Sequence, residues 1–346
     1  MILRKLKHKA FNRLRTAICP SPESRDVYTT KPSPMILNKA VIVDVSGGLC
    51  NQMMCYKAAR MISDWNDSSI VIVSKMYDDL KQNAESHTNF QLHFYPIRYD
   101  LLFLGHDAID LICDANSIFR VTREMLFCEN GDDRLDAEGI LALKERLKSC
   151  KVVWIDIWFS LLVWRRSDLF KLPRGVIAEL TLEPSGVLNS RDSEILSLIS
   201  KCGNPVALHV RRGDFLNPDN DLAVDHGYYI KAIGHLREQV DDAVFFVFSD
   251  DIAWCRSVFR ECNAVVYVDH NPVGSGHLDL YLASCCRHFI LTGHSTFSHH
   301  MVELNRANQG RISISNGMEH LHTQRDLKSY HVPEHCVLLT DALGGC

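Results

Sequence analysis

The stretch Pro-Val-Ala-Leu-His-Val-Arg-Arg-Gly-Asp-Phe, residues 205–215, decides the fold. Residues 205–208 form a short apolar run that is typical of a buried parallel strand. The polar residues that follow fall where this strand ends, and ligands of open α/β sheets bind beyond the carboxyl ends of the strands. Arg211 and Arg212 carry planar forks of donors that match phosphate oxygens, and Gly213 permits close approach of the backbone. We therefore favour an anionic ligand here, specifically a diphosphate.

Two other interpretations of this stretch stay open at this point. Arg211 or Arg212 could form a surface ion pair with Asp214. Residues 212–214 also spell the cell-adhesion tripeptide Arg-Gly-Asp. That motif requires an exposed loop tip, whereas this one leaves a core strand, so we disfavour adhesion.

Strands alternate with helices on both sides of this stretch, a pattern that predicts a parallel, doubly wound sheet. The expected strands lie at residues 40–45, 70–73, 152–155, 205–210, 243–248, 264–268 and 288–292. The expected helices lie near residues 51, 227–240, 252–262 and 277–286, from about 298, and after Asp136, whose helix should direct Ile140, Leu141, Leu143 and Leu147 inward. We predict an α/β fold with two Rossmann-like domains, residues 39–195 and 196–346, whose parallel sheets face a cleft.

The N-terminus differs from the rest of the chain. Residues 1–18 hold six basic and no acidic side chains, with apolar residues at helical spacing. Such a segment can lie on an anionic membrane surface, although a solvated or disordered start explains it equally well. Residues 19–38 contain four prolines among Ser and Thr and are expected to form a linker.

Composition limits the classes of function. A net charge of −4 gives no whole-protein footprint for nucleic acid. No apolar run approaches the roughly 18 residues of a spanning helix, and no signal peptide is apparent. The 13 cysteines are odd in number and irregularly spaced, which favours reduced thiols. We expect a cytoplasmic protein, with peripheral membrane contact left open.

Polar groups follow three further strands. Residues 46–52, Ser-Gly-Gly-Leu-Cys-Asn-Gln, join the first strand to its helix, and residues 249–251 and 292–298 follow two later strands. Helix N-termini and glycine-rich turns attract anions, and carboxylates can hold sugar hydroxyls. Tight turns and helix caps explain each segment alone about as well. The predicted ligand-binding residues are Gly47, Gly48, Asn51, Gln52, Ser249, Asp250, Asp251, Ser295, Thr296 and Phe297.

Metal-ligating patterns are weak. Asp219-Asn220-Asp221 fits an Asp-x-Asp metal motif but lies in a loop rich in Pro and Asn. The His and Cys residues between 285 and 300 show no spacing of a structural zinc site. We therefore predict no metal.

Taken together, these segments resemble glycosyltransferase family 11, the α-1,2-fucosyltransferases, particularly the bacterial branch. The resemblance rests on His209–Asp214, on residues 47–53, on Phe248–Asp251 with Trp254, and on Asp279 followed by residues 295–298. It implies a GT-B-like fold and inverting, metal-independent transfer of L-fucose from GDP-fucose to the 2-hydroxyl of a galactose-terminated glycan. The ligand-binding residues named above would then be donor-binding.

The resemblance also implies roles for the residues at 209–214. Arg211 and Arg212 would hold the β-phosphate as its charge grows, and His209 would orient them or contact the donor. Asp214 is a candidate base for the acceptor hydroxyl, although it could instead orient an arginine. Asp156 is another candidate base.

The sequence departs from the family in several places. Cys50 stands in place of a glycine, His294 in place of Asn, and His299 and His300 where bacterial members often have two Trp. Two alternative functions follow: a catalytically inactive protein that binds a GDP-sugar or a glycan, and a metal-dependent glycosyltransferase with another donor.

Overall fold

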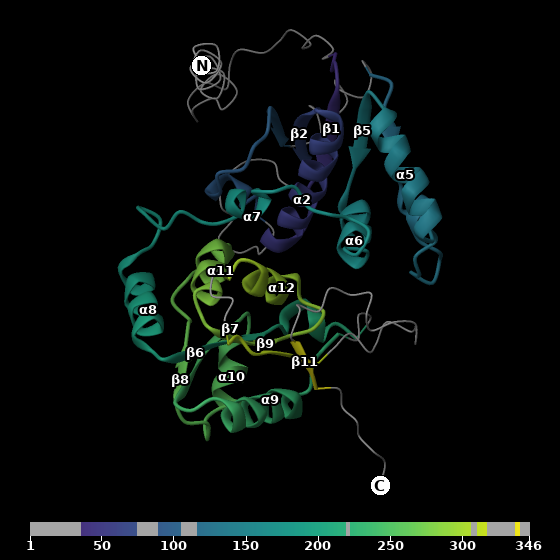
Figure 1. The fold of residues 1–346 in the computed structure, drawn as a ribbon. Coiled ribbons are helices and arrows are strands. Elements are labelled where there is room, and N and C mark those ends of the chain that lie inside the picture. Colours follow the sequence, from purple (N-terminus) through teal and green to yellow (C-terminus); the bar gives the residue numbers. More distant parts are fainter. Residues whose placement is uncertain are drawn as a thin grey trace.

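The computed structural model describes residues 36–74, 89–104, 116–218, 222–305, 310–316 and 336–339. The basic segment 1–18, most of the linker 19–38 and the triplet 219–221 lie outside these residues. Figure 1 shows an upper and a lower group of elements, which we call the N-terminal lobe (β1 to α7) and the C-terminal lobe (α8 to β11).

The N-terminal lobe is built on a five-stranded parallel sheet of order β3-β2-β1-β5-β4. Its strands are β1 (Ala40–Asp44), β2 (Ser69–Ser74), β3 (Leu101–Leu104), β4 (Phe119–Arg120) and β5 (Val152–Ile155). Its helices are α2 (Leu49–Asn66), α4 (Arg123–Leu126), α5 (Ala137–Ser149), α6 (Ile157–Arg165), α7 (Val176–Glu179) and the 3-10 turn η1 (Leu92–Phe94). The central strands β1 and β5 are buried along almost their whole length, as continuous apolar runs in parallel sheets require.

The C-terminal lobe is built on a six-stranded sheet of order β11-β10-β9-β6-β7-β8, also parallel. Its strands are β6 (Asn204–Val210), β7 (Ala243–Ser249), β8 (Val265–Tyr267), β9 (His288–Leu291), β10 (Ser313–Ser315) and β11 (Cys336–Leu338). Its helices are α8 (Ser190–Lys201), α9 (His226–Gln239), α10 (Ile252–Val258), α11 (Gly276–Ser284), α12 (Thr296–Glu303) and the 3-10 turn η2 (Gly213–Leu216). The expected α/β fold with two parallel sheets, the organisation of a GT-B-like protein, is thus confirmed.

Local sequence signals explain most element boundaries. Asp136 caps α5 by accepting a hydrogen bond from the Gly139 amide, as expected. The expectation for Leu141 is wrong, because its side chain is 57 % exposed on α5. Ile140, Leu143 and Leu147 suffice to cover the sheet, since they fall at the i, i+3 and i+7 positions of one helical stripe.

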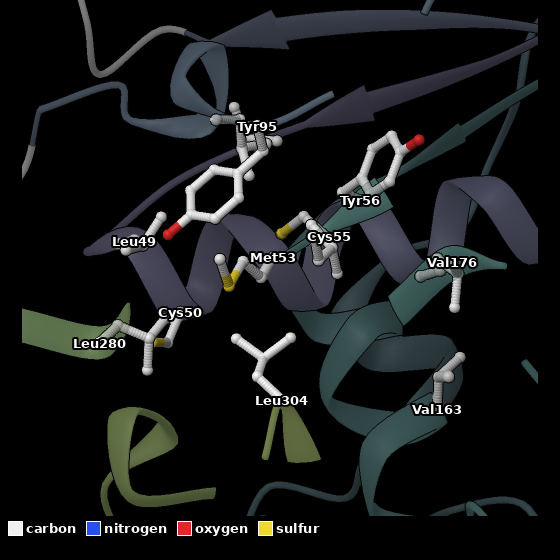
Figure 2. Packing of buried hydrophobic residues seen from close by; sticks show 14 of the residues in the cluster. Leu49, Cys50, Met53, Cys55, Tyr56, Tyr95, Val163, Val176, Leu280 and Leu304 are labelled. Carbon is white, nitrogen blue, oxygen red and sulfur yellow. The ribbon is translucent and has the colours of Figure 1, made fainter. Parts of the chain in front are cut away.

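One hydrophobic core runs through both lobes. It unites residues of α2 and β1 with residues of α11 and α12. Figure 2 shows Cys50 and Met53 of α2 beside Leu280 of α11 and Leu304, which follows α12. The expected boundary at residues 195 and 196 falls inside α8, a continuous helix that packs on α11. The division of the chain into domains stays a prediction.

Candidate functional site

The starts of two helices meet where the lobes face each other. The Thr296 hydroxyl at the start of α12 donates to Asn51 Oδ1 at the start of α2, at 3.1 Å. Further along the same helices, six residues after Asn51 and seven after Thr296, Lys57 Nζ lies 2.7 Å from Glu303 Oε2, with the lysine buried. The two helices therefore run side by side and in the same direction (Figure 1).

Neither helix start is capped by a side chain. The N-cap of α2 is Gly48, which has no side chain. The N-cap of α12 is Ser295, whose side chain makes no capping hydrogen bond. Gly47, with φ of 75°, requires the absence of a side chain, because a Cβ there would lie 2.6 Å from Asn51 Nδ2. The orphan amides and positive ends of two helix dipoles therefore converge on one place.

Ion pairs with aspartate carboxylates hold the loop after β6 in place. We call Arg211–Asp214 the arginine loop. Arg211 donates Nε to Asp214 Oδ1 at 2.9 Å, and its terminal nitrogens contact Asp214 and Asp250 at 2.7 and 2.9 Å. Nε therefore makes a hydrogen bond, and the two terminal nitrogens form ion pairs with the carboxylates. The ion pair with Asp214, one of the alternatives considered, does form.

Arg212 is held differently. Its backbone amide donates to Asp250 Oδ1 at 2.8 Å, its Nε donates to Asp251 Oδ2 at 3.1 Å, and its Cζ lies 4.0 Å from the centre of the Trp254 ring. Within the described part of the chain, its two terminal nitrogens have no hydrogen-bond partner. Arg212 therefore presents an oriented pair of free donors, which suits a phosphate.

Gly213 sets how closely the arginine loop approaches β7. A Cβ at Gly213 would lie 2.6 Å from Asp250 Oδ2. The loop can therefore contact this carboxylate only because residue 213 has no side chain. Residues 213–216 form the 3-10 turn η2, in which Gly213 and Asp214 are exposed and Phe215 is buried.

His209 is a neutral, buried group. Its Nδ1 lies 2.8 Å from Ser298 Oγ, and its ring stacks on Phe297 with centroids 4.6 Å apart. Burial, aided by the charge of Arg211, lowers the pKa of His209 to about 3. Ser298 Oγ already accepts from the Thr292 amide, so we assign its own proton to Nδ1 and the imidazole proton to Nε2. Phe297, expected to contact the donor, supports His209.

Thr292 at the end of β9 is a residue that sequence reasoning did not single out. Its hydroxyl donates to the His209 carbonyl at 2.9 Å and accepts from the Arg211 amide at 3.2 Å. It also pairs with the Tyr229 hydroxyl at 2.9 Å. Because the threonine proton is used on His209, Tyr229 is the donor in that pair. One buried hydroxyl thus ties the arginine loop to two neighbouring elements.

Gln52 lies behind the glycine turn and does not face the cleft. Its side chain is fully buried, and its amide donates to the carbonyls of Gly47 and Asn89 at 3.1 and 2.6 Å. The side-chain oxygen of Gln52 accepts a hydrogen bond from the backbone amide of Gln91 at 2.9 Å. The predicted direct contact of Gln52 with a donor is therefore not available, because backbone groups occupy the amide.

Gln91 carries the same chain of hydrogen bonds across to the C-terminal lobe. Its side-chain oxygen accepts from the His277 amide at 3.2 Å, at the start of α11. Burial lowers the pKa of His277 to about 4, and its ring stacks on Phe94 with centroids 3.7 Å apart. This contact spans 186 residues of sequence.

Residues at the end of β7 and just before α10 are also hydrogen-bonded within the protein. Asp251 caps α10 by accepting from the Trp254 amide at 3.0 Å, and Ser249 Oγ accepts from the Asp251 amide at 2.9 Å. The helix-cap interpretation of this segment is therefore realised in the structure. Asp279, buried on α11, accepts from Asn271 at 2.8 Å, and burial raises its pKa to about 6.

The two candidate bases differ in their surroundings. Asp214 is 61 % exposed in its side chain and ion-paired with Arg211. Asp156 is partly buried at the start of α6, where it accepts from the Trp158 amide at 2.9 Å. Burial raises the pKa of Asp156. Asp214 is thus placed to orient an arginine, whereas Asp156 stands on the other lobe.

The three histidines that depart from the family pattern lie on or before α12. His299 Nε2 contacts the Gly293 carbonyl at 2.9 Å, and its ring meets Trp164 of α6 edge-on, with centroids 5.0 Å apart. His300 is buried and donates Nδ1 to the Thr296 carbonyl at 2.8 Å. Its pKa falls to about 3 through burial. His299 therefore contributes to packing between the lobes.

A cavity of about 200 Å³ lies between the lobes. No residue of the arginine loop lines it; its lining residues are Tyr95, Thr181, Leu182, Leu280, Tyr281, Ser284, Cys285, Leu304 and Asn305. Among the described residues, no three His, Cys, Asp or Glu side chains gather as metal ligands would. The described cysteines form no disulfide, and no described helix has the length and apolarity needed to cross a bilayer.

Comparison with known proteins identifies the family. Residues 187–329 match Glycosyl transferase family 11. The α-1,2-colitosyltransferase of Escherichia coli is 35 % identical over 271 residues, which cover 75 % of this chain and 85 % of that protein. The chain belongs to glycosyltransferase family 11. The family expected from the sequence motifs is thus confirmed.

Other relatives match in part. The galactoside 2-α-L-fucosyltransferase Sec1 of Mus musculus is 36 % identical over 92 residues, 25 % of each chain. Among solved structures, the NodZ α-1,6-fucosyltransferase soaked with GDP-fucose aligns with a TM-score of 0.46 at 16 % identity, covering 78 % of this chain and 92 % of that one.

Proposed function

We propose that this glycosyltransferase is a galactoside 2-α-L-fucosyltransferase, which transfers L-fucose with inversion from GDP-fucose to the 2-hydroxyl of a terminal galactose. In this reaction the galactose 2-hydroxyl loses its proton to a carboxylate or to water, and its oxygen bonds to C1 of fucose. The bond from C1 to the β-phosphate oxygen breaks, and its electron pair leaves with GDP. Negative charge grows on the diphosphate. Catalysis then depends on donors that are already in place when this charge appears.

The observation that carries the proposal is the free donor pair of Arg212 beside two uncapped helix starts. Asn51 and Thr296 join the starts of α2 and α12, and Thr292 ties the arginine loop to the strand that leads into α12. A diphosphate there would accept hydrogen bonds from the Arg212 terminal nitrogens and from backbone amides near Gly48 and Ser295.

The carboxylates around the arginines have a positioning role in this proposal. Asp214 and Asp250 hold Arg211, and Asp250 and Asp251 hold Arg212. Fixed guanidiniums need no reorganisation when the leaving group departs. Each terminal nitrogen of Arg211 carries two N–H groups, so Arg211 can contact the phosphate as well as the carboxylates and share it with Arg212.

A second donor sugar deserves a direct comparison. The colitosyltransferase of Escherichia coli matches over most of its length, whereas the fucosyltransferase Sec1 matches over a quarter. The phosphate-binding groups proposed here contact only the diphosphate, so they do not distinguish the two sugars. A colitosyl donor is therefore the alternative substrate within the same mechanism.

The test is a transfer assay in excess chelator. Purified protein is incubated with GDP-fucose, and in parallel with a colitosyl donor, using lactose and N-acetyllactosamine as acceptors. We expect a 2-linked fucosyl product by NMR, formed at the same rate with and without chelator. Loss of transfer in chelator would favour a metal-dependent enzyme. GDP binding by calorimetry without any turnover would favour the catalytically inactive alternative.

A further inference from the structure

The carboxyl edge of the N-terminal sheet presents a carboxylate close to the glycine turn. Val43 pairs with Ile155 in the parallel register of β1 and β5, so Asp44 and Asp156 leave the sheet side by side. Gly47 lies three residues after Asp44. Adjacent strands are about 4.8 Å apart and a residue spans at most about 3.6 Å, so Asp156 lies within roughly 16 Å of Gly47.

This edge faces the C-terminal lobe. Trp164 of α6 contacts His299 of α12, and Figure 1 shows α6 at the end of the upper sheet that is directed toward α12. A donor held by the arginine loop would therefore have Asp156 on the opposite side of the interface.

Asp156 differs from the carboxylates of the C-terminal lobe in its partners. Asp214, Asp250 and Asp251 each contact an arginine. Asp156 accepts the Trp158 amide at 2.9 Å, and among the described residues it forms an ion pair with no cation. A carboxylate can accept about four hydrogen bonds. The amides of Trp158 and Phe159 thus fix the orientation of Asp156 and leave part of its acceptor capacity unused.

An exposed aromatic residue follows two positions after Asp156, on the first turn of α6. Trp158 is 38 % exposed, although most large hydrophobic side chains of this protein are buried. Arg123 lies 5.1 Å from the centre of its ring, and Phe127 meets it edge-on at 6.2 Å. The indole is therefore held in place while part of its surface stays open to solvent.

We propose that Asp156 and Trp158 form the acceptor subsite, in which the carboxylate accepts hydrogen bonds from hydroxyls of a neutral sugar and the indole contacts the apolar face of its ring. This inference rests on the proposed function for the role of the sugar as acceptor. Amphipathic aromatic rings are suited to surfaces that are apolar at one end and wet at the other. The subsite adds a recognition element on the lobe opposite the diphosphate.

The test separates acceptor binding from donor chemistry. Asp156→Asn keeps an oxygen that can cap α6 but removes the negative charge, and Trp158→Ala removes the ring. For each variant we expect the KM for lactose or N-acetyllactosamine to rise roughly tenfold or more, as loss of a charge-assisted hydrogen bond or a buried contact implies. The KM for GDP-fucose and the rate of its hydrolysis without acceptor should stay unchanged.

The matched control is Asp136→Asn, which alters the same residue type at the N-cap of α5, where Asp136 accepts from Gly139 at 2.8 Å. It should change none of these parameters. A drop in kcat alone in Asp156→Asn, with the acceptor KM unchanged, would overturn the subsite in favour of a base. Unchanged acceptor KM in both variants would also overturn it.

A binding measurement keeps this inference distinct from the proposed function. Saturation-transfer NMR with lactose needs no donor, and the signal should weaken in Asp156→Asn and Trp158→Ala but not in Asp136→Asn. If lactose binds through these residues while GDP-fucose is never consumed, the fucosyltransferase proposal fails and the sugar subsite stands. If GDP-fucose is consumed and neither variant changes lactose binding, the subsite fails.

Discussion

The guanidinium of Arg212 stacks on the indole of Trp254, with Cζ 4.0 Å from the ring centre. The tryptophan lies on α10, which follows the strand next to β6, so this contact holds the guanidinium in place. Cation–π contacts of this kind contribute about 0.5–2 kcal/mol. Their main effect here is to orient a fork of donors before any ligand arrives.

Replacing Arg212 by Lys should therefore impair transfer although the charge is retained. An ammonium has no planar fork, and its Nζ would not stack on Trp254 as the guanidinium does. We expect kcat/KM to fall by roughly 10²- to 10³-fold, as for loss of one preorganised donor in a transition state. Steady-state kinetics would measure this, and circular dichroism would show an intact fold. Near-native turnover would contradict the donor-site assignment.

Gly213→Ala should disturb the arginine loop through a single contact. The new Cβ would lie 2.6 Å from Asp250 Oδ2, so either the loop or the carboxylate must move. Overpacking of this kind costs about 1–3 kcal/mol, and transfer should fall with it. Gly234→Ala is the control, because nothing lies within 4 Å of a Cβ there. On α9 that change should stabilise by about 0.5–1 kcal/mol. Urea unfolding would measure both.

Thr292→Val should destabilise the chain with little change in shape. It removes a hydroxyl that contacts His209, Arg211 and Tyr229. Leaving such buried groups unsatisfied costs about 1–3 kcal/mol. Thr181→Val, which removes one hydrogen bond at a partly buried site, should cost less. Equal effects of the two substitutions on the free energy of unfolding would contradict the central role of Thr292.

Stability should fall as the pH is lowered from about 6.5 toward 4. Burial lowers the pKa values of four histidines in the folded state, to about 3 for His209 and His300 and to about 4 for His277 and His288. Below about pH 6.5 the unfolded chain binds protons that the folded chain does not, which favours unfolding. Asp279 opposes this below its folded pKa of about 6, because its carboxyl then takes up a proton in the folded state first.

Urea unfolding at several pH values between about 5 and 7 would measure this slope. His288→Asn should reduce the slope, because it removes one of the four buried histidines. A free energy of unfolding that rises toward pH 5 would contradict the expectation.

Strands with strong apolar runs, such as β1, β6 and β7, could be placed from sequence because burial on both faces leaves few alternatives. The cap of α5 by Asp136 was equally readable. Strands β10 and β11, at three residues each, are too short for periodicity to detect. Leu141 was misplaced because an apolar residue adjacent to a helical stripe does not reveal which side of the stripe it falls on.

The sequence predicts which strand ends carry the residues of the candidate site. It does not predict what each of these residues contacts. The side chain of Gln52 is hydrogen-bonded to the backbone of Asn89 and Gln91, which lie 37 and 39 residues away in the sequence. The function of Gln91 depends on His277, 186 residues away. Likewise, Thr292 gained its importance from three partners that only the tertiary structure brings together. Local patterns do not encode such long-range partners.

The shared core has a practical consequence for engineering. Because α2 packs lengthwise on α12 and Lys57 is buried against Glu303, a hybrid enzyme made by exchanging one half for that of a relative would bring together surfaces that did not evolve as a pair. A hybrid with a changed donor preference would therefore need the contacting residues of both α2 and α12 to come from the same parent enzyme.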